Sequence, residues 1–229
     1  MDFKSFLKNK EEMRRPLPIF ILADVSGSMD GAKIKQLNLS LRKMLTQLNE
    51  TKDIPGKFQL SVLTFNDQVN VVQPLADVDQ ITLQEFGAGG RTAMGAAFEK
   101  VSELIEDRNV VDSRAYRPMI LLMSDGAPTD FNGKSVEELA AWKPLQKLKN
   151  GARSSKAQRL ALAIGQDADE VLLQEFIGDP NVPLIRANNE QEIMRFFKWA
   201  TMTVIARMKS VNPDDITLPG SPDIDEENI

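Results

Sequence analysis

The feature that most restricts the fold is a near-continuous apolar run, Leu17–Ala23, followed closely by a helical pattern. A strand that is apolar on both sides is covered on both faces of its sheet. In residues 33–49, apolar side chains recur at spacings of three and four, which predicts the buried stripe of a helix. These two elements together favour a parallel sheet between two layers of helices.

The same alternation continues along the chain. Further strands are predicted at 58–65, 69–72, 119–123, 159–164 and 183–186, and further helices at 92–105, 136–148, 170–177 and 193–208. The turn residues Asn66 and Asp67 separate two of the strands, so we expect a hairpin there. The predicted fold class is α/β, a doubly wound and mostly parallel sheet with one antiparallel edge strand and helices on both faces.

Composition limits the chemistry. The 229 residues carry a net charge of −5 and include neither cysteine nor histidine. This excludes disulfides, thiol nucleophiles and any Ser-His-Asp arrangement, and it removes the commonest zinc ligand. The negative charge argues against binding to a nucleic-acid backbone. No apolar run approaches the roughly 18 residues of a membrane span, and the charged N-terminus is unlike a signal peptide, so we expect a cytoplasmic protein.

Composition also divides the chain into three parts. We expect a polar N-terminal arm at 1–16, one folded domain at 17–210, and an acidic, disordered tail at 211–229. The tail ends in DIDEENI, which places several carboxylates on a flexible tether. One of them could occupy the site of a neighbouring copy, as autoinhibition or self-assembly.

Two of the predicted strands end in carboxylates. Asp24, Ser26 and Ser28 form a D-x-S-x-S motif after the first strand, and Asp125 follows the strand at 119–123. Thr92 comes just after the glycine-rich loop 87–90. Ligands of open α/β sheets bind beyond the carboxyl ends of the strands, where these residues would meet. Five oxygen groups, two of them anionic, suit one hard divalent cation, with Mg²⁺ favoured and Mn²⁺ or Ca²⁺ as alternatives.

Simpler roles exist for the same residues. Strand-end aspartates often cap loops, and Ser26 and Ser28 are also common turn residues. The loop 87–90 has the glycines of a phosphate cradle but lacks the GK[ST] ending of a P-loop. A metal site is favoured over a structural turn because Thr92 and Asp125 add two further oxygen groups at the ends of other predicted elements.

The segments DVSGS, GGRT and SDG resemble the metal-ion-dependent adhesion site (MIDAS) of von Willebrand factor A (VWA) domains, over about residues 17–208. Within that family, MRRPLPIFILADVSGSMDG and LLMSDGAPTD are similar to TerY-type stand-alone bacterial proteins of tellurite-resistance and stress operons. The resemblance implies that Ser26 and Ser28 bind the metal directly and that Asp24 and Asp125 act through water. Thr92 would bind directly or through water, which leaves a sixth position for an acidic residue of a partner.

Arg91 departs from the family pattern, because many relatives have glycine directly before the threonine. We expect Arg91 either to steer the partner's carboxylate or to pair with Asp30 or Asp130. Together with Met29 and Asp130, it makes up the set of candidate partner contacts.

The expected function is that of a non-enzymatic, metal-dependent interaction module. The resemblance implies a scaffold or regulator in a bacterial stress or tellurite-resistance phosphorylation circuit, with a PP2C-type phosphatase or a protein kinase as partner. An alternative is a co-factor of an AAA+ ATPase.

Two other classes are disfavoured. A metal-dependent phosphatase or aspartyl-phosphate phosphotransferase would resemble the haloacid dehalogenases, but Ser26 replaces the second aspartate of their D-x-D-x-T pattern. An extracellular adhesion domain would fit the fold, but the sequence shows no secretion signal, anchor or disulfide.

Overall fold

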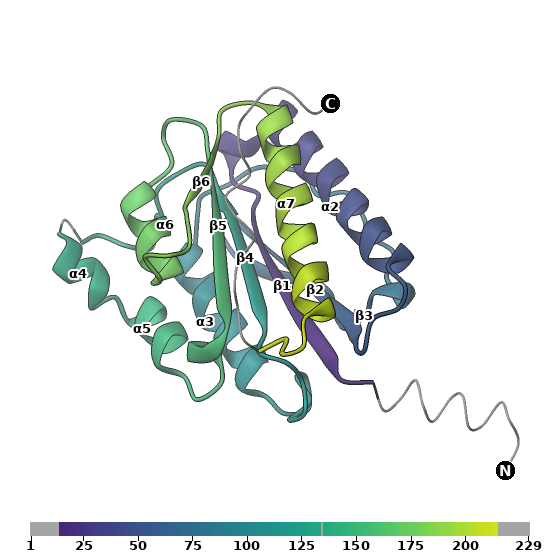
Figure 1. Ribbon diagram of the computed structural model, residues 1–229. Coiled ribbons are helices and arrows are strands. Elements are labelled where there is room, and N and C mark those ends of the chain that lie inside the picture. The colour runs from purple at the N-terminus through teal and green to yellow at the C-terminus, as the bar shows by residue number, and fades with distance from the viewer. Residues whose placement is uncertain (1–13, 134, 215–229) are drawn as a thin grey trace, which may run out of the picture.

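The structure is a computed structural model that describes residues 14–133 and 135–214. Within them, six strands form one sheet in the order β3-β2-β1-β4-β5-β6 (Figure 1). The strands are β1 (Pro16–Asp24), β2 (Lys57–Phe65), β3 (Val69–Asp77), β4 (Met119–Ser124), β5 (Gln158–Ile164) and β6 (Ile185–Ala187).

Six α-helices and three short 3-10 helices flank the described sheet. The α-helices are α2 (Ala32–Glu50), α3 (Met94–Glu106), α4 (Val136–Ala140), α5 (Lys143–Asn150), α6 (Glu170–Ile177) and α7 (Glu190–Lys209). The 3-10 helices are η1 (Gly27–Met29), η2 (Val78–Gln80) and η3 (Ser154–Lys156). None of the helices that the structure describes has the length and apolar character needed to cross a membrane.

The strand order reverses at β1. This strand pairs in parallel with β2 on one side and with β4 on the other, and β4, β5 and β6 continue in parallel. At the opposite edge, β3 pairs antiparallel with β2, as expected for the predicted hairpin. Helices α2 and α7 lie side by side on one face, and α3, α5 and α6 lie on the other (Figure 1). The predicted fold class is confirmed.

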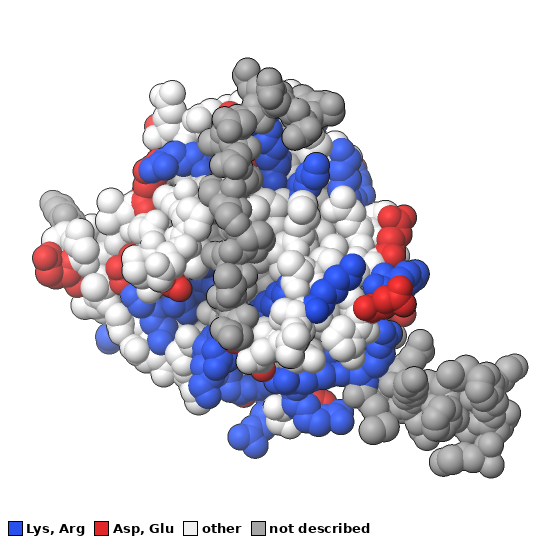
Figure 2. All heavy atoms as spheres, in the orientation of Figure 1, with Lys and Arg blue, Asp and Glu red and all other residues white. Residues whose placement is uncertain are grey.

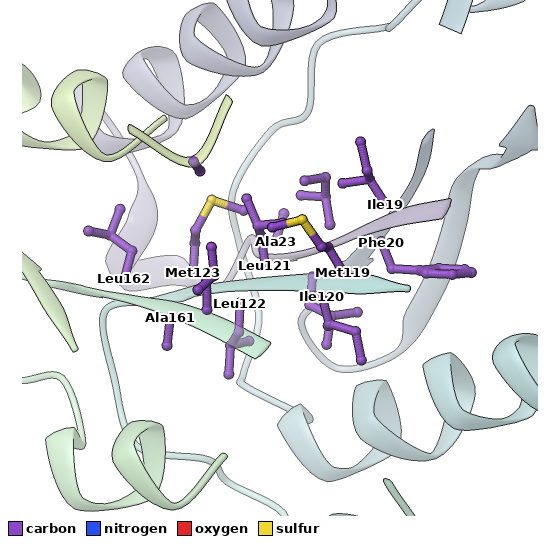
Figure 3. Packing of buried hydrophobic residues seen from close by; sticks show 14 of the residues in the cluster. Ile19, Phe20, Ala23, Met119, Ile120, Leu121, Leu122, Met123, Ala161 and Leu162 are labelled. Carbon is purple, nitrogen blue, oxygen red and sulfur yellow. The ribbon is translucent and has the colours of Figure 1, made fainter. Parts of the chain in front are cut away.

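The central strands form the middle of the core. All nine residues of β1 and all six of β4 are buried, as the apolar runs predict for strands covered on both faces. Figure 3 shows the alternation along β4, with Met119 and Met123 pointing to one face and Ile120 and Leu122 to the other. This packing holds the ends of β1 and β4 rigidly side by side.

One predicted helix is divided in two. The helix expected at 136–148 is broken between α4 and α5, where Trp142 has an extended backbone conformation. Pro144 explains the break, because proline lacks the N–H that a helix interior needs and its ring restricts the preceding residues. The helix expected to begin at Thr92 begins at Met94 instead.

The predicted arm and tail fall largely outside the described residues. Of the tail, residues 211–214 are described, and the Asp214 carboxylate accepts hydrogen bonds from the Arg15 side chain at 2.7 Å and from Arg117 N–H at 2.8 Å. The start of the predicted tail is therefore held against the edge of the sheet where β1 begins.

Candidate metal centre

Asp24 is the last residue of β1 and is fully buried. Its Oδ1 accepts a hydrogen bond from Ser26 N–H at 2.8 Å, and its Oδ2 accepts one from the Ser124 hydroxyl at 2.5 Å. Burial raises the pKa of Asp24, and the charge of Asp125 acts in the same direction, although the hydrogen bonds from Ser124 and Ser26 oppose this rise. Both oxygens are thus anchored at the carboxyl edge of the sheet.

A row of hydrogen bonds continues from Ser26 to the end of β4. Ser26 Oγ lies 3.1 Å from Ser28 Oγ, and the Ser28 hydroxyl donates to Asp125 Oδ1 at 2.7 Å. Ser26 and Asp125 are buried, whereas Ser28 is exposed. Four of the five predicted metal-binding residues therefore lie next to one another, and the row opens to solvent at Ser28.

Thr92 is brought to the same edge by its backbone. Gly90, two residues earlier, accepts a hydrogen bond from Gly27 N–H at 3.0 Å, inside the D-x-S-x-S loop. Thr92 N–H donates to Thr129 Oγ1 at 3.2 Å, and Thr129 N–H donates to the Thr92 carbonyl at 2.8 Å. Gly90 has a φ of 83°, and a Cβ there would lie 2.3 Å from Asp67 Oδ2, so the loop requires glycine at this position.

Sequence reasoning missed two residues of the site. Lys33, in the first turn of α2, places its Nζ 2.6 Å from Asp125 Oδ2 and 3.3 Å from the Ser28 carbonyl oxygen. Its side chain is 38% exposed, whereas that of Asp125 is 0% exposed, so a solvent-facing ammonium compensates a buried carboxylate. Ser124 lies in the SDG segment, but only Asp125 of that segment was predicted to take part in the site, and no motif marks Lys33.

The groups present fit a hard divalent cation. All the donors are carboxylate or hydroxyl oxygens, the ligands that Mg²⁺, Mn²⁺ and Ca²⁺ prefer. No group of three or more Asp, Glu, His or Cys suited to a metal occurs in residues 14–133 and 135–214. A cation at this edge would therefore need the hydroxyls of Ser26, Ser28 and Thr92 in addition to the two carboxylates.

Arg91 does not pair as expected. Its Nε donates to Asp67 Oδ1 at 2.8 Å, and this contact lowers the pKa of Asp67. The expectation of a pair with Asp30 or Asp130 is wrong, because the hairpin between β2 and β3 brings Asp67 to the glycine-rich loop. The Arg91 side chain is 77% exposed, so it remains at the surface near the candidate metal centre.

The other two candidate partner contacts, Met29 and Asp130, both have structural roles, although only Met29 is buried. The Met29 side chain is fully buried in the core, which removes it from the surface that a partner would touch. The Asp130 carboxylate accepts hydrogen bonds from Gly95 N–H at 3.2 Å and Ala96 N–H at 3.0 Å, at the start of α3. It satisfies free amide groups at that helix terminus, as capping side chains do.

Residues 19–199 match the sequence profile of the von Willebrand factor type A domain, so the chain belongs to this family. Domains of this family commonly mediate metal-dependent protein interactions and bind a divalent metal at the MIDAS. They are generally interaction modules rather than enzymes.

The chain is similar to parts of larger proteins. Human inter-alpha-trypsin inhibitor heavy chain H4 is 26% identical over an alignment of 253 positions, gaps included. The alignment covers 93% of this chain and 27% of that protein. One similar solved structure is the ArnB paralog VWA2 from Sulfolobus acidocaldarius, with 18% identity and a TM-score of 0.59 over 86% of this chain and 46% of that one. Another is a von Willebrand factor type A protein from Catenulispora acidiphila, with 16% identity and a TM-score of 0.62 over 82% of this chain and 42% of that one.

A third solved structure is proximal thread matrix protein 1 from the mussel byssus, with a zinc-occupied MIDAS motif (16% identity, TM-score 0.58, 84% of this chain and 48% of that one). At these identities the solved structures show the fold alone. The chain spans between about a quarter and a half of the length of the proteins named.

Proposed function

We propose that this chain binds a protein partner by coordinating an acidic side chain of the partner to a divalent cation at the carboxyl edge of the sheet. The cation would be held by Asp24, Ser26, Ser28, Thr92 and Asp125. The observation that carries the proposal is the hydrogen-bonded row Asp24–Ser26–Ser28–Asp125, which is buried at both ends and open at Ser28.

Each residue has a separate part in this proposal. The exposed Ser28 hydroxyl and the adjacent Ser26 hydroxyl would be the direct ligands, and Thr92 would complete the set from the glycine-rich loop. Asp24 and Asp125 would act through water, and their two negative charges balance one divalent ion. When bound, the cation supplies a Lewis acid that attracts an incoming carboxylate.

The cation is proposed to be Mg²⁺. The support is the all-oxygen donor set, which lacks the nitrogen and sulfur ligands that favour zinc in most proteins. Among the solved structures, the mussel byssus protein has zinc at its MIDAS.

Arg91 is proposed as the rim residue of the partner surface. It is exposed and lies next to the glycine-rich loop, so its charge would attract an acidic surface around the incoming carboxylate. Met29 and Asp130 are not kept in this role, because the first is buried and the second holds the start of α3.

The biological setting is also a proposal, and it rests on the resemblance of the motif segments to TerY-type proteins. In that setting the chain would be a cytoplasmic bacterial scaffold in a stress or tellurite-resistance circuit, with a PP2C-type phosphatase or a protein kinase as partner. Assistance to an AAA+ ATPase is the alternative. Against the phosphatase reading, Asp24 is fully buried with both oxygens hydrogen-bonded, so it is poorly placed to act as a nucleophile.

The test is recovery of partners by the tagged full chain in Mg²⁺ and then in EDTA. Ser26→Ala should lose the partners that wild type retains in Mg²⁺, and EDTA should release them from wild type. Ser155→Ala, an exposed serine in η3, is the matched control and should behave as wild type. Partners that are retained equally with EDTA and with Ser26→Ala would contradict the proposal.

A further inference from the structure

A second site lies at the opposite edge of the sheet, where the strands begin. There, a hollow of about 270 Å³ is lined by five cationic residues and one carboxylate: Arg15, Arg108, Arg117, Arg153, Lys156 and Asp214. We call it the basic pocket. Figure 2 shows Lys and Arg side chains gathered along the lower edge of the molecule, the edge at which β1 begins in Figure 1. A chain with a net charge of −5 thus surrounds one hollow with a clear positive excess.

Two of the arginines are held in place by neutral groups, and one of them, Arg15, is also paired with Asp214. Arg15 Nε donates to the Arg114 carbonyl oxygen at 2.5 Å, and its guanidinium lies 3.9 Å from the centroid of the Tyr116 ring. Arg153 Nη2 donates to the Asp112 carbonyl oxygen at 2.9 Å, while its Nη1 is buried without a hydrogen-bond partner. Carbonyl oxygens and a ring thus orient both guanidinium groups, and the charge of Arg15 is in part balanced by Asp214.

The remaining cations of the basic pocket have side chains available to a ligand. In the described part of the chain, the side chains of Arg108, Arg117 and Lys156 make no hydrogen bond or ion pair, and all three residues are exposed. The one carboxylate of the pocket, Asp214, forms an ion pair with Arg15, with 2.7 Å between Arg15 Nη2 and Asp214 Oδ2. Two oriented arginines and three free cations therefore face one hollow.

We propose that the basic pocket binds the phosphate group of a phosphate-bearing ligand. A phosphate near neutral pH carries close to two negative charges and presents three acceptor oxygens, which several cations can share. The planar guanidinium group matches a phosphate with two parallel hydrogen bonds. One carboxylate offers a single charge and fewer acceptors, so it would leave more of the positive excess unmatched. The hollow is small and the chain as a whole is acidic, which disfavours a nucleic-acid duplex.

This site is independent of the proposed metal centre. The basic pocket lies where β1 and β4 begin, whereas Asp24 and Asp125 lie where these strands end. The chain would then be able to hold an acidic side chain at one edge and a phosphate at the other.

The test is calorimetric titration of the full chain with inorganic phosphate, with a short phosphoserine peptide and with the same peptide unphosphorylated. EDTA is present throughout and ionic strength is constant, so that no metal at the other edge contributes. The pocket variant is the double substitution Arg108→Gln and Lys156→Gln. The matched control, Lys43→Gln with Lys198→Gln on α2 and α7, removes the same charge on another face.

Wild type and the control should bind the phosphorylated probes with affinities within about twofold of each other, and the pocket variant should bind at least about tenfold more weakly. Ser26→Ala should bind phosphate as wild type does, even if the metal proposal fails. A phosphopeptide that binds much more tightly than inorganic phosphate identifies a modified protein as the source, and equal binding identifies a small phosphate compound. The proposal would be overturned if the pocket variant and the control lost phosphate affinity equally. It would also be overturned if wild type bound neither phosphorylated probe at a probe concentration of about 10 mM.

Discussion

Lys33 affects the charge balance of the proposed metal centre. Its ammonium lies 2.6 Å from Oδ2 of Asp125, whose side chain is wholly buried. A divalent cation and this ammonium would compete for the same carboxylate, because both are positive and both lie at the same edge of the sheet. Lys33 is thus expected to weaken metal binding and to stabilise the fold when metal is withdrawn.

Lys33→Met should therefore have two opposite effects. We expect Mg²⁺ affinity in calorimetric titration to rise by roughly tenfold, because one competing charge is removed. In EDTA, we expect urea unfolding to show a loss of roughly 1–2 kcal/mol, because a buried carboxylate loses its cation and the lysine is partly solvated. Lys35→Met, at an exposed position of the same helix, should change neither value. An unchanged or weaker Mg²⁺ affinity would show that Lys33 does not compete.

The sequence predicted which residues gather at this edge of the sheet better than it predicted their contacts. Asp24, Ser26, Ser28 and Asp125 were identified because strand ends and a short spacing are visible in one dimension. The contact of Lys33 with Asp125 joins positions 92 residues apart, and that of Arg91 with Asp67 joins positions 24 apart. Such contacts depend on how loops meet in the folded chain, which periodicity does not report.

At the level of elements, the start of α3 depends on a side chain from another segment. Asp130 accepts hydrogen bonds from Gly95 N–H and Ala96 N–H, and α3 has no side-chain cap of its own at Ala93. A negative charge at a helix N-terminus is also favoured by the helix dipole. The loop after β4 thereby holds the helix that follows Thr92.

Asp130→Ala should destabilise the fold by about 1 kcal/mol in urea unfolding, since two amide groups lose their acceptor. Asp130→Asn keeps one acceptor oxygen and should lose less. A stability equal to wild type for Asp130→Ala would mean that water replaces the carboxylate at no cost.

Element boundaries were predicted less well than element types. The apolar spacing of residues 136–148 continues through Trp142, so the pattern alone gives one helix. The break comes from Pro144, a local steric restriction that the hydrophobic period does not contain. Helix α3 begins at Met94 rather than at Thr92 for a different reason. The N–H groups of Thr92 and Ala93 donate hydrogen bonds to residues of other loops.

At the scale of the whole molecule, the end of α7 is tied to the start of β1. Arg207, near the end of α7, is buried and donates to the carbonyl oxygens of Pro213 and Arg117. Burial lowers the pKa of Arg207 to about 10, so the group keeps its charge at neutral pH. Asp214 completes the connection by binding Arg15 and Arg117 N–H.

This connection gives a pH-dependent prediction. Burial alone would raise the pKa of Asp214, but hydrogen bonds from Arg117 N–H and the Arg15 side chain outweigh it, and the pKa is lowered. A carboxyl with a lowered folded-state pKa contributes stability above its unfolded pKa of about 3.9, and this contribution is lost as the pH falls through the folded-state value. Asp214→Asn should cost about 1 kcal/mol at pH 7 in urea unfolding. The difference from wild type should disappear in strong acid, and a difference independent of pH would contradict this account.

The fold as a whole was predictable because strands and helices alternate along the entire domain. The basic pocket was not, because its cations come from separate segments around residues 15, 108, 117 and 153–156. Only the arrangement of β1, β4 and the loops before them brings these side chains to one hollow.

The measurement that tests the central claim most directly is calorimetric titration of Mg²⁺ into wild type, Ser26→Ala and Ser155→Ala, with circular dichroism to confirm that each variant is folded. We predict one Mg²⁺ bound per chain for wild type and Ser155→Ala, and no measurable binding for a folded Ser26→Ala. Equal Mg²⁺ binding by all three proteins, or none by wild type, would contradict a metal centre at this edge of the sheet.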